Sequence, residues 1–153
     1  MAGTYTQIYI QCVFAVKHRQ GLLGKAWRQE VFKYMSGIVT NKGSKSIIIN
    51  GVSDHVHLFI GLNPATALSD LVRDVKNNSS KFINEQKWLA SKFQWQSGYG
   101  AFSYAQSQLG AVYRYIENQE EHHRKKSFRE EYHEFLKKYE IDHDERYLFE
   151  WLE

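Results

Sequence analysis

The order of predicted elements, β-α-β-β-α-β followed by further helices, places this chain in the α+β class with a ferredoxin-like, split β-α-β architecture. Three observations predict this order: an alternating apolar segment at the start, two segments with helical periodicity, and three further extended segments. Such a fold has an antiparallel sheet with helices on one face, so we expect the other sheet face to be free for function. With no linker or low-complexity tract, the 153 residues predict a single domain over 1–153.

The first predicted strand covers residues 4–16, where apolar residues alternate with polar ones such as Gln7 and Gln11. Residues 25–42 follow with apolar side chains at helical spacing, and Gly43 is the predicted end of that helix. Two isoleucine-rich or aromatic segments, 46–52 and 55–62, then predict a hairpin.

The second predicted helix begins near Thr66, its expected N-cap. Its apolar stripe is made of Leu68, Leu71, Val72, Val75, Phe82 and Ile83. Its opposite face is basic and amide-rich, with Arg73, Lys76, Asn77, Ser80, Lys81 and Asn84.

The aromatic segment 93–104, interrupted by Gly98 and Gly100, predicts one or two strands with a tight bend. A third helix is predicted over 107–123, and a capping box, Ser127-Phe128-Arg129-Glu130, opens a fourth.

Composition limits the classes of function. The net charge of +3 permits a nucleic-acid partner without requiring one. The single cysteine, Cys12, excludes an intramolecular disulfide and lies in the alternating strand, so we expect a buried thiol and a cytoplasmic location. The sequence has no apolar stretch of membrane-spanning length, and its first residues lack the features of a signal peptide.

The segment Ser53-Asp54-His55-Val56-His57-Leu58 carries a pair of histidines separated by one apolar residue. Because strand side chains alternate faces, His55 and His57 point to the same side, while Val56 and Leu58 point into a core on the other. Two imidazoles side by side on a rigid strand provide two ligands for a metal ion.

A second group lies in Tyr115-Ile116-Glu117-Asn118-Gln119, on the third predicted helix. Tyr115 and Gln119 are four residues apart and share a helix face. The Gln119 amide oxygen is a hard ligand and the Tyr115 phenol a nucleophile, so with the two histidines they predict a divalent ion site beside an oxygen nucleophile. Such an ion orients a phosphodiester and neutralises its charge while the tyrosine attacks phosphorus. Two imidazoles beside hard oxygen donors fit Mg²⁺ or Mn²⁺ with bound waters.

Over roughly residues 4–139 the sequence resembles the single-tyrosine transposases of the HUH superfamily, encoded by small bacterial insertion sequences. The resemblance is carried by Asp54-His55-Val56-His57-Leu58, by the tyrosine segment 115–119 with His122-His123-Arg124 after it, and by the segment 93–102. It implies that His55, His57 and Gln119 bind Mg²⁺ or Mn²⁺ and that Tyr115 is the nucleophile.

The resemblance also implies a reaction and partners. The enzyme is expected to nick single-stranded DNA, forming a covalent 5′-phosphotyrosine and a free 3′-hydroxyl that reverses the reaction on a new strand. Members recognise a DNA hairpin near each element end and work as homodimers, in some of which the tyrosine helix completes the partner's site.

The same residues are compatible with other roles. The histidines are compatible with a structural role, and Tyr113 is a rival nucleophile, although it lies about 200° around the helix from Tyr115. A zinc hydrolase would use a third ligand such as His18 or His122, and a domesticated, non-catalytic single-strand nucleic-acid binder would need no nucleophile.

The predicted DNA contacts are Arg73, Lys76 and Lys81 on the second helix, together with Arg124. The basic face of that helix is also compatible with an ordinary solvated surface. Arg124 belongs to a basic run, 122–126, which would complement a helix C-terminus without any further function. The aromatic residues of 93–102 are predicted to be core rather than a platform for stacking bases.

Overall fold

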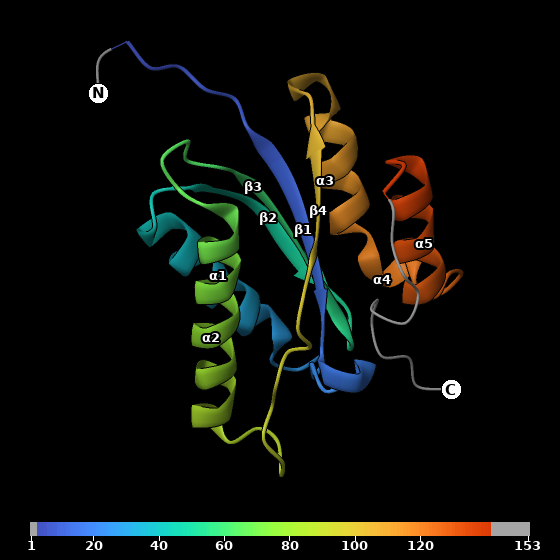
Figure 1. The fold of residues 1–153 in the computed structure, drawn as a ribbon. Coiled ribbons are helices and arrows are strands. Elements are labelled where there is room, and N and C mark those ends of the chain that lie inside the picture. The colour runs from blue at the N-terminus through green and yellow to red at the C-terminus, as the bar shows by residue number, and fades with distance from the viewer. Residues whose placement is uncertain (1–2, 142–153) are drawn as a thin grey trace.

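The computed structural model describes residues 3–141 and contains a four-stranded antiparallel sheet with the order β2-β3-β1-β4 (Figure 1). The strands are β1 (Tyr9–Ala15), β2 (Lys45–Gly51), β3 (His55–Gly61) and β4 (Gly100–Tyr104). With one helix between β1 and β2 and another between β3 and β4, this is the predicted ferredoxin-like topology.

Helices α1 (Arg28–Asn41) and α2 (Leu68–Gln86) cover one face of the sheet (Figure 1). The core between them contains the inward side chains of β1 and β3 and the predicted stripe of α2. Gly43 lies just past α1 with a φ of +87°, as expected of a residue that ends a helix. The prediction for Thr66 is wrong by one residue, because Ala67 is the N-cap of α2 and makes no side-chain cap.

Strands β2 and β3 form the predicted hairpin, in which Gly51 pairs with Val56. A Cβ atom at Gly51 would clash with the carbonyl oxygen of His55, so only glycine permits this close turn. The turn therefore determines where the first histidine of the pair begins its strand.

The aromatic segment before β4 is mostly core, as predicted. Phe93 and Phe102 are buried, Trp95 forms an isolated bridge with Val16, and Gly98 turns the chain with a φ of +87°. Tyr99 is the exception, with 36% of its surface exposed.

The second face of the sheet is covered, contrary to the prediction that it would be free. Helices α3 (Leu109–Glu117), α4 (Gln119–His122) and α5 (Phe128–Lys138) lie on the side opposite α1 and α2 (Figure 1). Phe59 packs against Val112 and Ile116 of α3, while a second cluster joins α5 to Val13 and Ala15 of β1. The helices after β4 return over the sheet because β1 and β3 also carry apolar side chains on this face.

The third predicted helix is divided. Asn118, with φ −96° and ψ 26°, separates α3 from α4. The cause lies in a neighbouring strand: the Asn50 side-chain amide donates to the carbonyl oxygens of Ile116 (3.0 Å) and Glu117 (3.1 Å). These two carbonyl oxygens therefore have the Asn50 amide as a hydrogen-bond partner from outside the helix.

Ser127 is the N-cap of the last helix, which confirms one half of the predicted capping box. The Ser127 hydroxyl accepts a hydrogen bond from the Glu130 backbone N–H (3.2 Å) at the start of α5. Two short 3₁₀ helices, η1 (Lys17–Arg19) and η2 (Gln106–Gln108), connect other elements.

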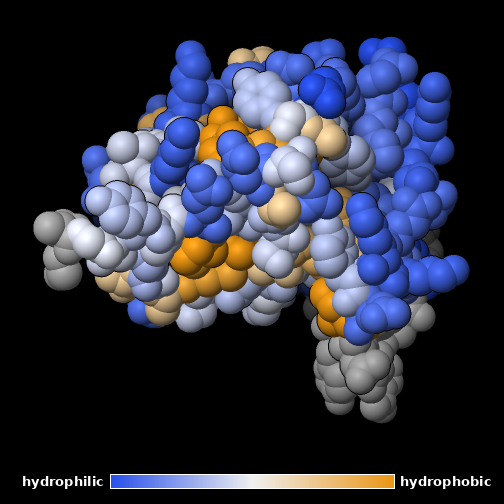
Figure 2. Space-filling model, turned by 90° about the horizontal axis from the view of Figure 1, so that it is seen from above, coloured by the Kyte–Doolittle hydropathy of each residue, from blue (hydrophilic) through white to orange (hydrophobic). Residues whose placement is uncertain are grey.

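No helix within residues 3–141 is long and apolar enough to cross a membrane. Seen from above, hydrophilic side chains cover most of the surface, and hydrophobic ones emerge between them in small patches (Figure 2).

Candidate functional site

His55 and His57 lie on the face of β3 that α3 and α5 cover, and both are completely buried. Val56 and Leu58 point into the opposite core, as the alternation predicts. The two rings are 5.2 Å apart between centroids.

Each histidine is oriented by an acceptor on its Nδ1 atom. His55 Nδ1 lies 2.7 Å from an Asp54 carboxylate oxygen, and His57 Nδ1 lies 2.6 Å from Gln11 Oε1. Because both partners are acceptors, each Nδ1 carries the hydrogen, and Nε2 points into the site. This is the arrangement of metal-binding histidines, whose other ring nitrogen donates to a carboxylate or carbonyl.

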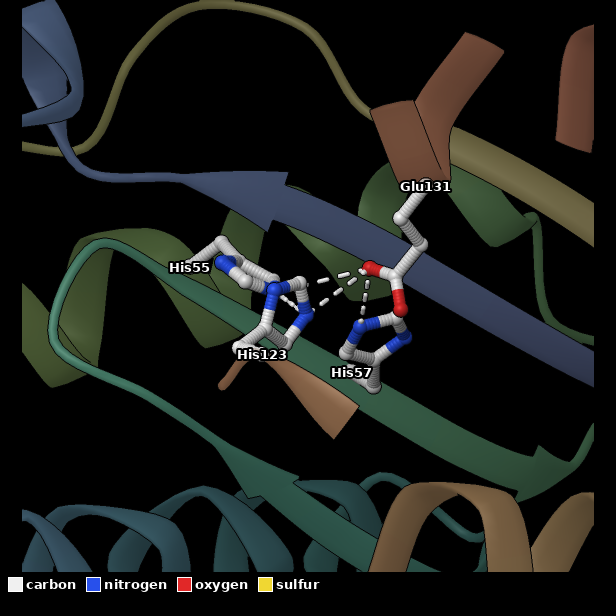
Figure 3. Close-up of side chains that lie close together, drawn as sticks. All are labelled: His55, His57, His123 and Glu131. Carbon is white, nitrogen blue, oxygen red and sulfur yellow. Dashed lines mark hydrogen bonds and ion pairs between the residues drawn. The ribbon is translucent and has the colours of Figure 1, made fainter. Parts of the chain in front are cut away.

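Glu131 of α5 completes the cluster and was not singled out from the sequence (Figure 3). The residue is 1% exposed, and its Oε1 atom lies 3.1 Å from His57 Nε2 and 3.5 Å from His55 Nε2. Burial would raise the pKa of Glu131, but the two histidines outweigh it and lower that pKa to about 2. Glu131 is therefore anionic at neutral pH.

The pKa values of the two histidines shift in opposite directions. Burial lowers the pKa of both rings, but the hydrogen bonds that His55 donates to the Asp54 and Glu131 carboxylates overcome it and raise the His55 pKa. At His57 burial prevails, so its pKa falls and the ring is neutral at neutral pH.

Tyr115 and Gln119 both reach the same cluster. The Tyr115 hydroxyl donates to Glu131 Oε2 and lies 3.2 Å from His122 Nε2. Gln119 is fully buried, and its side-chain nitrogen lies 3.5 Å from Glu131 Oε2. Tyr113, the rival nucleophile, is 40% exposed and lines a different surface pocket beside β2.

His123 is a further member of the cluster that sequence reasoning did not place. Its Nε2 atom lies 3.1 Å from His55 Nε2 and 3.0 Å from Gln119 Oε1. Burial lowers the pKa of His123 to about 3, so the ring is neutral. The structure therefore places His123 next to the histidine pair, whereas His122 faces the tyrosine.

The donor set fits a divalent cation. One ligand atom from each of His55, His57, His123 and Glu131 lies within 4.8 Å of the others (Figure 3). Donors about 2.1 Å from one ion are about 3.0 Å apart in an octahedral site and about 3.4 Å apart in a tetrahedral one. The separations of 3.1, 3.3 and 3.5 Å from Glu131 Oε1 to the three imidazoles are of this size.

A second observation supports this fit. The Nδ1 atom of His57 faces the Gln11 side-chain oxygen, so its Nε2 atom, 3.1 Å from Glu131 Oε1, is the ring nitrogen left to bind an ion. A cation between this nitrogen and the Glu131 oxygen makes their contact favourable.

The nucleophile side of the cluster opens to a cavity. A cavity of about 310 Å³ lies between β4, α3 and α5, and Tyr115, His122 and Glu131 line it together with Tyr104 and Phe135. A substrate therefore has a path to the Tyr115 hydroxyl without entering the core.

The predicted DNA contacts on α2 lie apart from this cluster, whereas Arg124 directly follows His123 in the chain. Arg73 is paired with Asp70 and Asp74, and Arg124 with Glu121. Lys76 donates to the carbonyl oxygens of Gln96 (2.8 Å) and Gly98 (2.5 Å), and burial lowers its pKa to about 8. Lys81 is exposed. The three α2 residues occupy a helix on the other side of the sheet from Tyr115.

The family model for IS200-like transposases matches residues 4–119, which include His55, His57, Tyr115 and Gln119. The chain belongs to the IS200-like transposase family. The match ends before α5, so Glu131 lies outside it.

Relatives and solved structures agree with this assignment. The ISDra2 transposase TnpA of Deinococcus radiodurans is 23% identical over 124 residues, covering 76% of this chain and 87% of the relative. A crystal structure of a putative transposase from Deinococcus radiodurans R1 aligns with a TM-score of 0.62 at 21% identity, over 78% of this chain and 95% of that one.

A REP-associated tyrosine transposase bound to a REP hairpin has a similar fold. It aligns with a TM-score of 0.60 at 13% identity, over 80% of this chain and 73% of that one. The fold of this IS200-like transposase is therefore that of two solved relatives.

Proposed function

We propose that this transposase is a site-specific endonuclease and strand transferase of single-stranded DNA, with Tyr115 as its nucleophile. The observation that carries the proposal is the position of the Tyr115 hydroxyl, which lies at a buried histidine–carboxylate cluster and lines an open cavity. Among the ten tyrosines of the chain, Tyr115 is the one found at this cluster within residues 3–141.

The reaction is a transesterification. The Tyr115 oxygen bonds to phosphorus while the bond from phosphorus to the 3′ oxygen breaks, leaving a 5′-phosphotyrosine and a 3′-hydroxyl. Attack of a 3′-hydroxyl on the phosphotyrosine reverses the step on a new strand, so no ATP is needed. A divalent ion, Mg²⁺ or Mn²⁺, held by His55, His57 and Gln119, supplies Lewis-acid stabilisation of the phosphate charge.

Other residues of the chain orient the two histidines and position Tyr115. Asp54 and Gln11 keep the ring hydrogens of His55 and His57 on Nδ1, which leaves both Nε2 atoms to bind an ion. α3 packs on Phe59 of the sheet and keeps Tyr115 close to the histidines.

We propose that the substrate is single-stranded DNA with a hairpin at each element end, bound by a homodimer in the cytoplasm. Arg73, Lys76, Lys81 and Arg124 are the proposed phosphate contacts, of which Lys81 has the fewest competing interactions in the described structure. Residues 1–153 are proposed to act as one domain. Since Tyr115 and the histidines meet within one chain, this arrangement needs no tyrosine from the partner.

A covalent-adduct assay tests the proposal. Labelled single strands spanning the flanks of the gene are incubated with the protein and Mn²⁺, then separated on a denaturing gel. We expect a protein-linked band that is lost with a chelator and in Tyr115→Phe. Tyr113→Phe is the matched control, because it removes the same hydroxyl from an exposed position on the same helix and should retain the band.

Three outcomes would contradict the proposal. Cleavage that survives Tyr115→Phe would mean that water is the nucleophile, as in a metal-dependent hydrolase. DNA binding without an adduct on every strand would favour a non-catalytic binder. An adduct lost in Tyr113→Phe but kept in Tyr115→Phe would move the nucleophile to Tyr113.

A further inference from the structure

The Glu131 carboxylate touches two groups that the proposed reaction uses separately. One oxygen, Oε1, lies 3.1 Å from His57 Nε2 and 3.5 Å from His55 Nε2. The other, Oε2, accepts the hydrogen bond of the Tyr115 hydroxyl. A carboxylate has acceptor sites on both oxygens, so it can make both interactions at once.

We propose that Glu131 is a ligand of the divalent ion through Oε1 and that its Oε2 holds the Tyr115 hydroxyl, so that one side chain joins the metal centre to the nucleophile. The inference rests on the proposed function, because it assigns a fourth ligand to the metal site on which that function depends. It adds a ligand from α5 to the set of His55, His57 and Gln119.

The burial of the carboxylate supports this assignment. A buried anion is costly unless it is paired with charges or binds a metal ion. Glu131 is 1% exposed, and the groups facing it are the imidazoles of His55, His57, His122 and His123, the Tyr115 hydroxyl and the Gln119 amide. Within residues 3–141 its ion pairs are with imidazoles and not with a lysine or arginine, and a divalent cation bound among these rings would compensate the carboxylate charge more fully than one imidazolium.

The packing of α5 also supports it. Phe128 stacks on the His55 ring, with centroids 4.0 Å apart and planes 16° apart. Phe128, Tyr132 and Leu136 bury the same helix face that carries Glu131, and Ser127 caps the helix. The side chain is therefore held by a packed helix rather than by a surface loop, as a ligand needs to be.

The assignment changes the chemistry expected of the ion. An anionic carboxylate with two or three imidazoles favours a transition metal such as Mn²⁺ over Mg²⁺, which prefers oxygen ligands and retains its waters. We therefore expect tighter binding of Mn²⁺ than of Mg²⁺. A ligand on α5 also makes metal binding depend on the chain beyond the family match.

Isothermal titration calorimetry of the intact protein with Mn²⁺ measures the affinity for the ion in the absence of DNA, and so tests the ligand role of Glu131. Glu131→Gln should weaken Mn²⁺ binding by at least about 10–100-fold, because an anionic ligand is replaced by a neutral one. Glu130→Gln is the matched control: it removes the same charge from the exposed neighbouring residue and should bind Mn²⁺ like the wild type. Wild-type affinity in Glu131→Gln, or tighter binding, would overturn the ligand assignment.

A separate measurement tests whether each variant is folded. The melting temperature of each variant is measured with and without Mn²⁺, and the Mn²⁺-dependent rise should be smaller in Glu131→Gln than in Glu130→Gln. If Glu131→Gln does not fold, Glu131→Asp serves in its place, since it keeps the charge but is shorter by one methylene. Equal Mn²⁺-dependent rises in wild type and the folded Glu131 variant would contradict the inference.

The link to Tyr115 has its own readout. At saturating Mn²⁺, Glu131→Asp should form the DNA adduct more slowly, because the shorter side chain cannot reach both the ion and the hydroxyl. An adduct rate equal to that of the wild type would refute the link. A wild-type protein that binds Mn²⁺ through Glu131 but forms no adduct would instead refute the proposed function and leave the ligand role intact.

Discussion

Asn50 provides a test of how the sheet positions the tyrosine segment. Its side-chain amide on β2 donates to the carbonyl oxygens of Ile116 and Glu117, at the end of α3. Asn50→Asp keeps the size of the side chain but replaces the donor with a second acceptor. The new carboxylate would face two carbonyl oxygens at the negative end of a helix.

The magnitude follows from these contacts. Each lost hydrogen bond costs about 1 kcal/mol at a partly exposed site, and the charge at the helix end adds about 0.3–1 kcal/mol. We therefore expect Asn50→Asp to lower the free energy of unfolding by about 2–3 kcal/mol at pH 7. Asn50→Ala should cost about 1–2 kcal/mol, because water can replace the lost donor. For a chain of this size the larger change lowers the melting temperature by about 4–12 °C.

Urea unfolding followed by circular dichroism measures both variants against the wild type. The acceptor-rich surroundings should raise the pKa of the new carboxyl above its unfolded value of about 3.9. The destabilisation is therefore present above the folded pKa, and it should diminish as the pH falls through that value, because the protonated acid can donate. Asn50→Ala should show no such recovery. Wild-type stability of Asn50→Asp at pH 7, or equal pH-independent losses in both variants, would refute the reasoning.

Three further predictions concern positions around the same sheet. Gln11→Leu removes the acceptor that holds the His57 ring and should weaken Mn²⁺ binding by about 10–100-fold, measured by calorimetry; unchanged affinity would contradict the role of Gln11. Gly51→Ala places a methyl group against the His55 carbonyl and should lower stability by about 1–3 kcal/mol in urea unfolding, whereas an unaffected midpoint would show that the hairpin relaxes without strain. Burial raises the pKa of Cys12 to about 12, so the thiol stays protonated at pH 8 and should react with a disulfide reagent only after unfolding; rapid reaction of the native protein would refute its burial.

Much of the site follows from local periodicity. The period of two in β3 places His55 and His57 on one side, and the helical period separates Tyr115 from Tyr113. The order of strands and helices likewise predicts the sheet, and the structure confirms it. The metal-ligand and nucleophile roles remain predictions, although the structure brings Gln119 and Tyr115 to the histidines.

Other features of the site depend on contacts between distant segments. Glu131 lies 74 residues from His57 along the chain, and in the sequence it is one of several acidic residues on an amphipathic helix. Helical spacing places Glu131 beside the apolar stripe of α5 and Glu130 on the exposed face, but this pattern predicts burial and not a place among the histidines. Only the packing of α5 against the sheet brings Glu131 next to His55 and His57.

The sequence by itself determined the elements, their order and the faces on which the two histidines and Tyr115 lie, because these properties depend on backbone geometry within a few residues. The tertiary structure decided that helices cover the second sheet face, that Asn50 interrupts the tyrosine helix, and that Glu131 and His123 join the cluster. The covering helices are held by packing between distant segments, and the hydrogen bonds of Asn50, His123 and Glu131 join residues 66 to 74 positions apart. Burial makes each of these polar groups depend on partners from other elements.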